Sequence, residues 1–191
     1  MTEPQRTEPP MSAEAFMDWY DQQPDGERYE LLNGRIYKMQ SERATHARAK
    51  GALYIALVNA IRARKLPCEA FVDGMAVRVD DQTVFEPDVL VQCGSPVAGQ
   101  TIVMRDPAIV VEVLSPASQH VDFYRKFNGY FRNRAVMHYL IVNSVDGNLV
   151  HHSRMPDGRI ESAHRDGGKL ALHPPGLELD LDALFKGGFG G

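Results

Sequence analysis

Apolar residues recur at the spacing of amphipathic helices in three stretches of the chain, residues 12–20, 44–64 and 118–134. Ser12 is the expected N-cap of the first helix, because its hydroxyl can accept a hydrogen bond from a free N–H group of the first turn. Pro67 separates the second helix from the strand that follows it. The pattern therefore predicts three helices separated by other elements.

Apolar runs between and after these helices predict strands. The runs cover residues 69–79, 87–93, 107–114 and 136–144. The third run is almost continuously apolar, as expected of a strand that is buried on both faces. Three dipeptides have the composition of tight hairpin turns, and these are Asn33-Gly34, Asp146-Gly147 and Asp157-Gly158. This order of elements predicts an α/β or α+β fold, with a mixed central β-sheet flanked by helices.

The size and composition of the chain fit one globular domain. It has 191 residues, of which 43% are hydrophobic and 24% charged. We expect residues 11–186 to form this domain, between a disordered segment at 1–10 and a flexible glycine-rich tail at 187–191. No run approaches the roughly 18 uncharged apolar residues of a membrane span. The polar, acid-containing N-terminus is not typical of a secretory signal.

Charge and cysteine content narrow the function classes. The net charge of −4 argues against a protein that coats nucleic acid nonspecifically, because such binding depends on neutralising phosphates. Cys68 and Cys93 lack the spacing of a metal or redox motif, so we expect reduced thiols and a cytoplasmic location. His151 and His152 are adjacent in a predicted strand, and we expect both at the surface.

Two carboxylates occupy unexpected positions in the predicted strands. Asp88 stands at the start of the apolar run 89–91, and Glu112 lies within a run that otherwise consists of Ile, Val and Leu. Burial of an acid in such a setting is costly unless the acid is protonated or neutralised by a cation. Carboxylate oxygens suit Mg²⁺ or Mn²⁺. The pair therefore indicates a metal site at neighbouring strand ends.

The following helix supplies a candidate cation. Lys126 comes four residues after Asp122, so the two share a helical face, and it borders the aromatic stripe of this helix. A lysine at such a border can reach into a cleft. The position two residues after Glu112, on the same face of its strand, holds Leu114 rather than a base.

Several stretches of the chain together resemble a known family. They are FMDWYDQQPDGERYELLNGRIYKM, THARAKGALYIAL, FEPDVLV, PAIVVEVLSPAS and DFYRKFNGYFRNRAVMHYLIV. Each piece is a weak signal alone, but their combination is specific. The chain resembles the Uma-type family of restriction-endonuclease-like proteins, within the PD-(D/E)XK nuclease superfamily. The resemblance covers nearly the whole chain.

The resemblance implies roles for individual residues. Asp88 and Glu112 would be metal ligands, and Lys126 would take the role of the lysine that the superfamily carries two residues after the glutamate. In this branch the lysine is thought to have moved onto the helix, which agrees with the helical spacing. Glu30 and His46 match positions that recur in the family.

Each of these residues also has a purely structural interpretation. Asp88 could cap its strand, Glu112 could be a salt-bridged buried acid, and Lys126 could be a solvated lysine in an ion pair. Glu30 could face solvent before the hairpin turn. His46 could simply belong to the first turn of its helix.

The favoured hypothesis is a Mg²⁺- or Mn²⁺-dependent endonuclease that hydrolyses phosphodiester bonds in nucleic acid, with DNA as the expected substrate. Asp88, Glu112 and the backbone carbonyl of Val113 would hold the metal. Lys126 would orient the attacking water or stabilise the charge of the transition state.

We also expect a homodimer, because cutting both strands of a duplex needs two active sites. Strand edges between Val136 and Ile160 are the expected contact region.

The main alternative is a noncatalytic protein that keeps the nuclease fold and binds nucleic acid or a protein partner. The net negative charge and Leu114 favour it. A metal-dependent hydrolase of another phosphoester is a third possibility.

Overall fold

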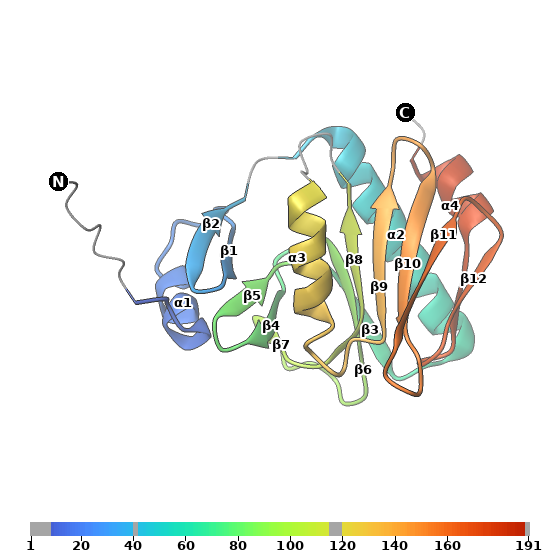
Figure 1. Cartoon of the computed structure of the whole chain (residues 1–191). Helices are drawn as coiled ribbons and strands as arrows, with labels where there is room; N and C mark the ends of the chain where they lie inside the picture. Colours follow the sequence, from blue (N-terminus) through green and yellow to red (C-terminus); the bar gives the residue numbers. More distant parts are fainter. Residues whose placement is uncertain (1–8, 40–41, 115–119, 190–191) are drawn as a thin grey trace.

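The computed structural model of the chain describes residues 9–39, 42–114 and 120–189 (Figure 1). The side chains of residues 120–123 are not described, so the predicted pairing of Lys126 with Asp122 lies outside the described part, as does most of the segment predicted to be disordered. The helices are α1 (Ala13–Tyr20), α2 (Ala44–Arg64), α3 (His120–Tyr130) and α4 (Leu181–Gly188).

A mixed six-stranded sheet forms the centre of the fold. Its strands, in spatial order, are β11 (Ile160–Arg165), β10 (Asn148–Arg154), β9 (His138–Asn143), β8 (Pro107–Val113), β6 (Val89–Cys93) and β3 (Cys68–Val72). β8 and β9 are parallel to each other, while the other neighbours are antiparallel. This architecture confirms the predicted mixed central sheet.

Two smaller sheets complete the described fold. One has the order β2 (Arg35–Lys38), β1 (Tyr29–Leu32), β5 (Thr83–Phe85), β4 (Ala76–Asp80) and β7 (Val103–Met104). The other pairs β12 (Lys169–Leu172) with β13 (Leu177–Asp180). The smaller sheets lie towards opposite ends of the molecule, with the central sheet between them (Figure 1).

The helices α2 and α3 lie on opposite faces of the central sheet (Figure 1). Side chains of β8 alternate between these faces. Ile109, Val111 and Val113 pack in the hydrophobic cluster that contains the buried residues of α2, whereas Val110 packs in the cluster that contains the end of α3. Glu112 therefore belongs to the α3 face of the sheet.

The local signals of the sequence account for several element boundaries. The Ser12 hydroxyl accepts a hydrogen bond from the Ala15 N–H at 3.2 Å, as predicted for the N-cap of α1. Asn33 and Gly34 have φ values of 48° and 73°, which the tight turn between β1 and β2 requires. The predicted helix at 44–64 coincides with α2.

A glycine allows α3 to approach β5 closely. A Cβ atom at Gly129 would lie only 2.4 Å from a ring carbon of Phe85. The absence of a side chain at this position therefore brings α3 against β5, and with it the residues of α3 that face the central sheet.

Other segments depart from the predicted pattern. The run at 69–79 is not one strand: it divides into β3 and β4, which belong to different sheets, at Asp73 and Gly74, whose φ values are 53° and 68°. Helix α4 extends through Gly188, into the part assigned to the tail. The expected free edges between Val136 and Ile160 are wrong, because β9 and β10 are paired on both sides and the edge strand is β11.

The cysteines also differ from expectation. Cys68 and Cys93 pair directly across β3 and β6 and are joined by a disulfide, so the prediction of reduced thiols is wrong. Their spacing along the chain does not indicate this, because the pairing depends on strand register. None of the described helices is both long and apolar enough to cross a membrane.

The disulfide leads to a stability prediction. It closes a loop of 25 residues, so replacing both cysteines by serine should lower the free energy of unfolding by about 3 kcal/mol, chiefly by freeing the unfolded chain. For a chain of this size, that corresponds to a fall of about 6–12 °C in melting temperature. Calorimetry with and without reductant measures it. The double variant should not respond to reductant, and a wild type that also ignores reductant would contradict the prediction.

Candidate functional site

Asp88 and Glu112 meet at one end of the β6–β8 ladder. Val89 pairs with Val111 in this ladder, so the next pair outward brings Asp88 opposite Glu112. The Asp88 carboxylate turns towards β8, where Oδ2 accepts a hydrogen bond of 2.7 Å from the Val113 N–H. The two acids are 4% and 7% exposed, so both are buried although they carry ionisable groups. The ladder therefore brings them together away from solvent.

Burial dominates the electrostatics of Asp88. It raises the pKa of this carboxyl above its ordinary value, while the hydrogen bond from Val113 and the charges of His46, Lys50 and Lys126 act in the opposite direction. The Asp73 N–H also donates to the backbone carbonyl of Asp88 at 3.1 Å. Backbone and side chain of Asp88 are thus both fixed by neighbouring groups.

The pKa of Glu112 is also raised. Burial raises its pKa to about 8; Asp88 and Glu30 also raise it, while Lys126 lowers it. Oε1 of Glu112 accepts hydrogen bonds from Lys126 Nζ at 3.1 Å and from the Tyr130 hydroxyl at 2.6 Å. Two donors on one oxygen therefore do not fully offset the loss of solvation.

Lys126 bridges two acids from different sheets. Its Nζ lies 3.1 Å from Glu112 on β8 and 3.0 Å from Oε1 of Glu30 on β1. The same Glu30 oxygen accepts the Glu86 N–H at 2.9 Å. Lys126 is only 5% exposed, so it is a buried lysine rather than a solvated one. Glu30 likewise turns inward rather than to solvent.

His46 approaches the site from the first turns of α2. Its Nε2 lies 2.9 Å from the carbonyl oxygen of Val113 and 3.5 Å from Oδ2 of Asp88. Because a carbonyl oxygen only accepts, Nε2 carries the proton of this contact. Nδ1 is buried without a hydrogen-bond partner among the described residues, and lies 3.3 Å from Oε2 of Glu42.

The structure adds residues that the sequence analysis did not identify. Tyr130 belongs to the aromatic stripe of α3, and its hydroxyl donates a hydrogen bond to Glu112. Lys50 lies four residues after His46, and this spacing alone could have placed both on one face of α2, whereas Glu42 lies just before the helix begins. Further partners around the site are Arg28, Asp73 and Glu86.

The donor set fits a divalent cation. One ligand atom from each of Glu42, His46 and Asp88 lies within 4.8 Å of the others. Acids also outnumber bases around the site: the acids are Glu30, Glu42, Asp73, Glu86, Asp88 and Glu112, and the bases that contact them are Arg28, His46, Lys50 and Lys126. Carboxylate, imidazole and carbonyl groups with a deficit of positive charge are suited to such an ion.

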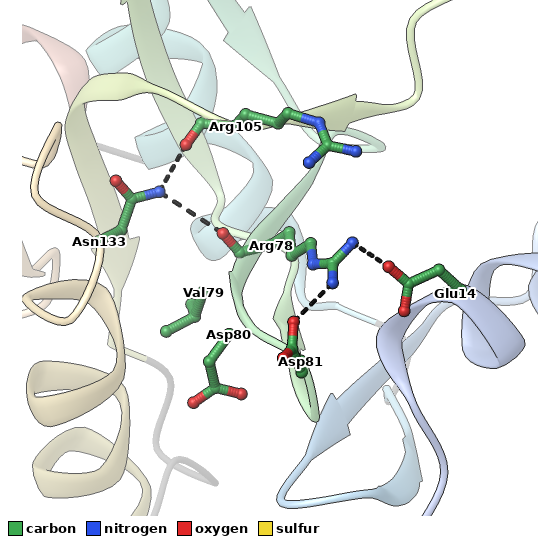
Figure 2. A pocket seen from close by; sticks show the side chains of 7 residues that line it. All are labelled: Glu14, Arg78, Val79, Asp80, Asp81, Arg105 and Asn133. Atoms are coloured by element: carbon green, nitrogen blue, oxygen red, sulfur yellow. Dashed lines mark hydrogen bonds and ion pairs between the residues drawn. The ribbon is translucent and has the colours of Figure 1, made fainter.

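A polar hollow of about 600 Å³ lies elsewhere, between α1, β4 and the segment after α3 (Figure 2). Arg78 spans it, paired with Glu14 and, at 2.7 Å, with Asp81. Asn133 donates to the backbone carbonyls of Arg105 and Arg78 at 2.6 and 3.4 Å. Because its charged groups largely pair with one another and none is a predicted site residue, we assign this hollow no role in the chemistry.

Two histidines, His138 and His151, are buried, although His151 was expected at the surface. His151 is 8% exposed, and its Nε2 lies 2.9 Å from Nδ1 of His138, whose Nε2 lies 2.9 Å from the Pro174 carbonyl. Burial lowers the pKa of both rings to about 4. The prediction of a surface position was therefore wrong for His151, which helps join the central sheet to the segment between β12 and β13.

Comparison with known proteins gives consistent results. The model of the Uma2 family, described as "Putative restriction endonuclease", matches residues 13–184. "Uncharacterized protein slr1290" of Synechocystis sp. is 29% identical over 182 residues, which cover 94% of this chain and 93% of that protein. A crystal structure from Anabaena variabilis, titled "a putative nuclease belonging to DUF820", superposes with a TM-score of 0.73 at 14% identity. It covers 93% of this chain and 98% of that one.

The hydrogen bond between Tyr130 and Glu112 can be tested through stability. Tyr130→Phe removes the donor at 2.6 Å and leaves a buried carboxyl with one partner fewer, so the free energy of unfolding should fall by about 1–3 kcal/mol. Tyr124→Phe is the matched control on the same helix: Tyr124 is 73% exposed, and its change should stay within about 0.5 kcal/mol. Urea unfolding measures both. Equal midpoints for the two variants would show that the buried bond contributes nothing.

Proposed function

This chain belongs to the Uma2 family, and from this premise we propose that it is a metal-dependent endonuclease that hydrolyses phosphodiester bonds in nucleic acid, with DNA as its substrate. One observation carries the proposal: two buried carboxylates, Asp88 and Glu112, lie opposite each other at a strand end, with the ammonium of Lys126 on Glu112. A structural role alone gives no reason to bury so much charge at one point.

The proposed metal ligands are Asp88, Glu112 and the carbonyl of Val113, as the family resemblance implies, with His46 beside them. His46 and Asp88 both contact Val113, which supports a common site for these groups. Burial is the main cause of the raised pKa of Glu112, and a cation bound beside this carboxyl would favour its charged form. When bound, Mg²⁺ or Mn²⁺ makes a coordinated water more acidic and offsets negative charge on the scissile phosphate.

The protein groups around the acids act by orientation and charge. Lys126 would orient the attacking water or stabilise negative charge on the phosphate. Glu30 contacts the Lys126 ammonium together with Glu112. The Tyr130 hydroxyl holds one oxygen of Glu112, so the second oxygen remains for a cation. These contacts support catalytic or positioning roles for the residues that the sequence singled out.

The noncatalytic alternative retains a specific observation in its favour. Lys126 is engaged in two ion pairs in this structure, and Leu114 stands where the superfamily's lysine is expected. Metal binding does not discriminate between the two functions, because a protein without turnover could still bind the ion. Cleavage does. Plasmid DNA, single-stranded DNA and RNA should be incubated with Mg²⁺ or Mn²⁺, with Glu112→Ala as the control; cleavage that persists in this variant argues for a contaminating nuclease.

Two further parts of the proposal concern the cellular setting. A cytoplasmic location remains a proposal, and the argument from reduced thiols no longer supports it because Cys68 and Cys93 form a disulfide.

A homodimer also remains a proposal. Within the central sheet, β11 is the edge strand on the side predicted for the contact, so it replaces β9 and β10 as the candidate surface. Sedimentation at micromolar concentration measures the oligomeric state.

The metal site predicts a thermal shift. Mn²⁺ or Mg²⁺ should raise the melting temperature, because an ion bound only by the folded chain stabilises it, by about 2.7 kcal/mol at 100 times the Kd. Asp88→Asn should abolish the shift while keeping an oxygen that can accept the Val113 N–H. Asp157→Asn, a change at an exposed acid, is the control and should respond as the wild type does. Equal shifts in Asp88→Asn and wild type would place the bound ion elsewhere.

Loss of Lys126 should impair cleavage and leave metal binding intact. Lys126→Ala should reduce the cleavage rate about 100- to 10,000-fold, the usual loss for a proton-transfer or water-positioning group. The metal-induced thermal shift should persist. Adding Leu114→Lys should restore part of the activity, because it returns an ammonium group to the strand that carries Glu112. Cleavage at the wild-type rate in Lys126→Ala would remove Lys126 from the mechanism.

A further inference from the structure

A second buried lysine, Lys50, borders the site from the α2 side and has no role in the chemistry proposed above. It is 3% exposed. Its Nζ lies 2.7 and 2.8 Å from the two carboxylate oxygens of Asp73, contacts Oε2 of Glu42, and lies 3.9 Å from Oδ1 of Asp88. A buried ammonium group with three carboxylates around it is a strong local charge, and it lies next to a proposed metal ligand.

Helical spacing explains why Lys50 reaches this place. His46 and Lys50 are four residues apart, so they share one face at the start of α2. Glu42 lies just before the helix begins, and its carboxylate contacts both of them. That face meets the ends of β6 and β8, where His46 contacts Asp88 and Val113. The ligand atoms of Glu42, His46 and Asp88 that lie within 4.8 Å of one another are thus next to the Lys50 ammonium.

Lys50 and a divalent cation would compete for the same oxygens. The ammonium already contacts Glu42 and lies near Asp88, which supply two of the three clustered ligand atoms. Two positive charges about 4 Å apart also repel each other appreciably at the edge of a protein interior. Asp73 offers Lys50 a second partner through both of its carboxylate oxygens, so Lys50 stays paired if Glu42 turns towards an ion.

We propose that Lys50 is the resident counter-cation of the metal site: its ammonium neutralises Glu42 and Asp88 while no divalent cation is bound, and thereby sets the affinity for that cation. This inference rests on the proposed function, because it requires a cation to bind beside His46 and Asp88. It goes beyond that function in assigning Glu42 and Lys50 to the site, and in giving Lys50 a role in metal affinity rather than in the attack on phosphate.

The expected direction follows from charge. Lys50→Met keeps the length of the side chain and removes its charge, so Glu42 and Asp88 become available to the ion and the repulsion disappears. The Kd for Mn²⁺ should fall about tenfold or more. Lys50→Arg keeps the charge and should bind Mn²⁺ as the wild type does. Lys65→Met, at the exposed C-cap of the same helix, removes a lysine far from the site and should leave the Kd unchanged. Titration calorimetry with MnCl₂ measures all of these without any assay of cleavage.

A second variant separates local competition from overall charge and covers the case in which Lys50→Met does not fold. Lys50→Met combined with Asp73→Asn removes both charges of the Lys50–Asp73 ion pair, so neither residue is left as an unpaired charge. The net charge of the chain stays at its wild-type value. A tenfold tighter Kd in this double variant supports competition at Glu42 and Asp88, whereas an unchanged Kd overturns the proposal.

The outcomes distinguish this inference from the proposed function. A wild type that binds Mn²⁺, with Lys50→Met or the double variant binding equally or more weakly, overturns the role of Lys50 and leaves the nuclease proposal intact. Absence of Mn²⁺ binding in the wild type and in every variant ends both proposals. Binding that emerges only when the Lys50 charge is removed is the clearest support, because the resident ammonium alone would then have kept the ion out.

Discussion

The compensation of buried negative charge at the ends of β6 and β8 is the interaction on which the rest of the site depends. Strand register places Asp88 opposite Glu112, and both are too buried for water to stabilise their charged forms. Lys126 on α3 stabilises the charge of Glu112, and His46 and Lys50 on α2 stabilise that of Asp88. Two helices on opposite faces of the sheet thus supply cations to one strand end.

This arrangement explains the position of the smaller five-stranded sheet. Glu30 on β1 binds Lys126, and the segment after β5 leads through Glu86 into Asp88. Glu86 in turn contacts Arg28 at 2.8 Å and the Gly74 N–H at 2.8 Å. The small sheet therefore continues the charge network of the central sheet, and its hairpin turn at Asn33-Gly34 sets the register that points Glu30 inward.

Sequence pattern predicted much of this fold, for physical reasons that differ between elements. The α2 helix was found at its observed bounds because its buried face repeats Ala49, Leu53 and Leu57 at helical spacing. The family resemblance named Asp88, Glu112, Lys126, Glu30 and His46. In the structure His46 and Asp88 both contact the Val113 backbone, and Lys126 joins the neighbouring Glu112 to Glu30. Their chemical roles remain proposals.

What the sequence did not reveal depends on contacts between distant segments. The disulfide of Cys68 with Cys93 follows from the β3–β6 register, which no local pattern encodes. The division of 69–79 between two sheets depends on Asp73 and Gly74, whose positive φ values turn the chain between β3 and β4. Lys50 resembled any charged residue of a helix, because only the position of Asp73 and Asp88 in space shows that it is buried.

The connection of β1, α2, β8 and α3 through a few charged side chains has a consequence for biosynthesis. A ribosome produces Glu30, 96 residues before Lys126, and His46 and Asp88 well before Lys126 and Tyr130, whereas Glu112 precedes these two by only 14 and 18 residues. The parallel partner of β8, β9, follows later still. A nascent chain released before α3 would carry the acids without the ammonium that neutralises Glu112. Because loop closure over such separations is slow compared with local helix formation, the site should be among the last parts of the molecule to become ordered. Truncated products of translation would accordingly carry the acids without the contacts that surround them in the folded chain.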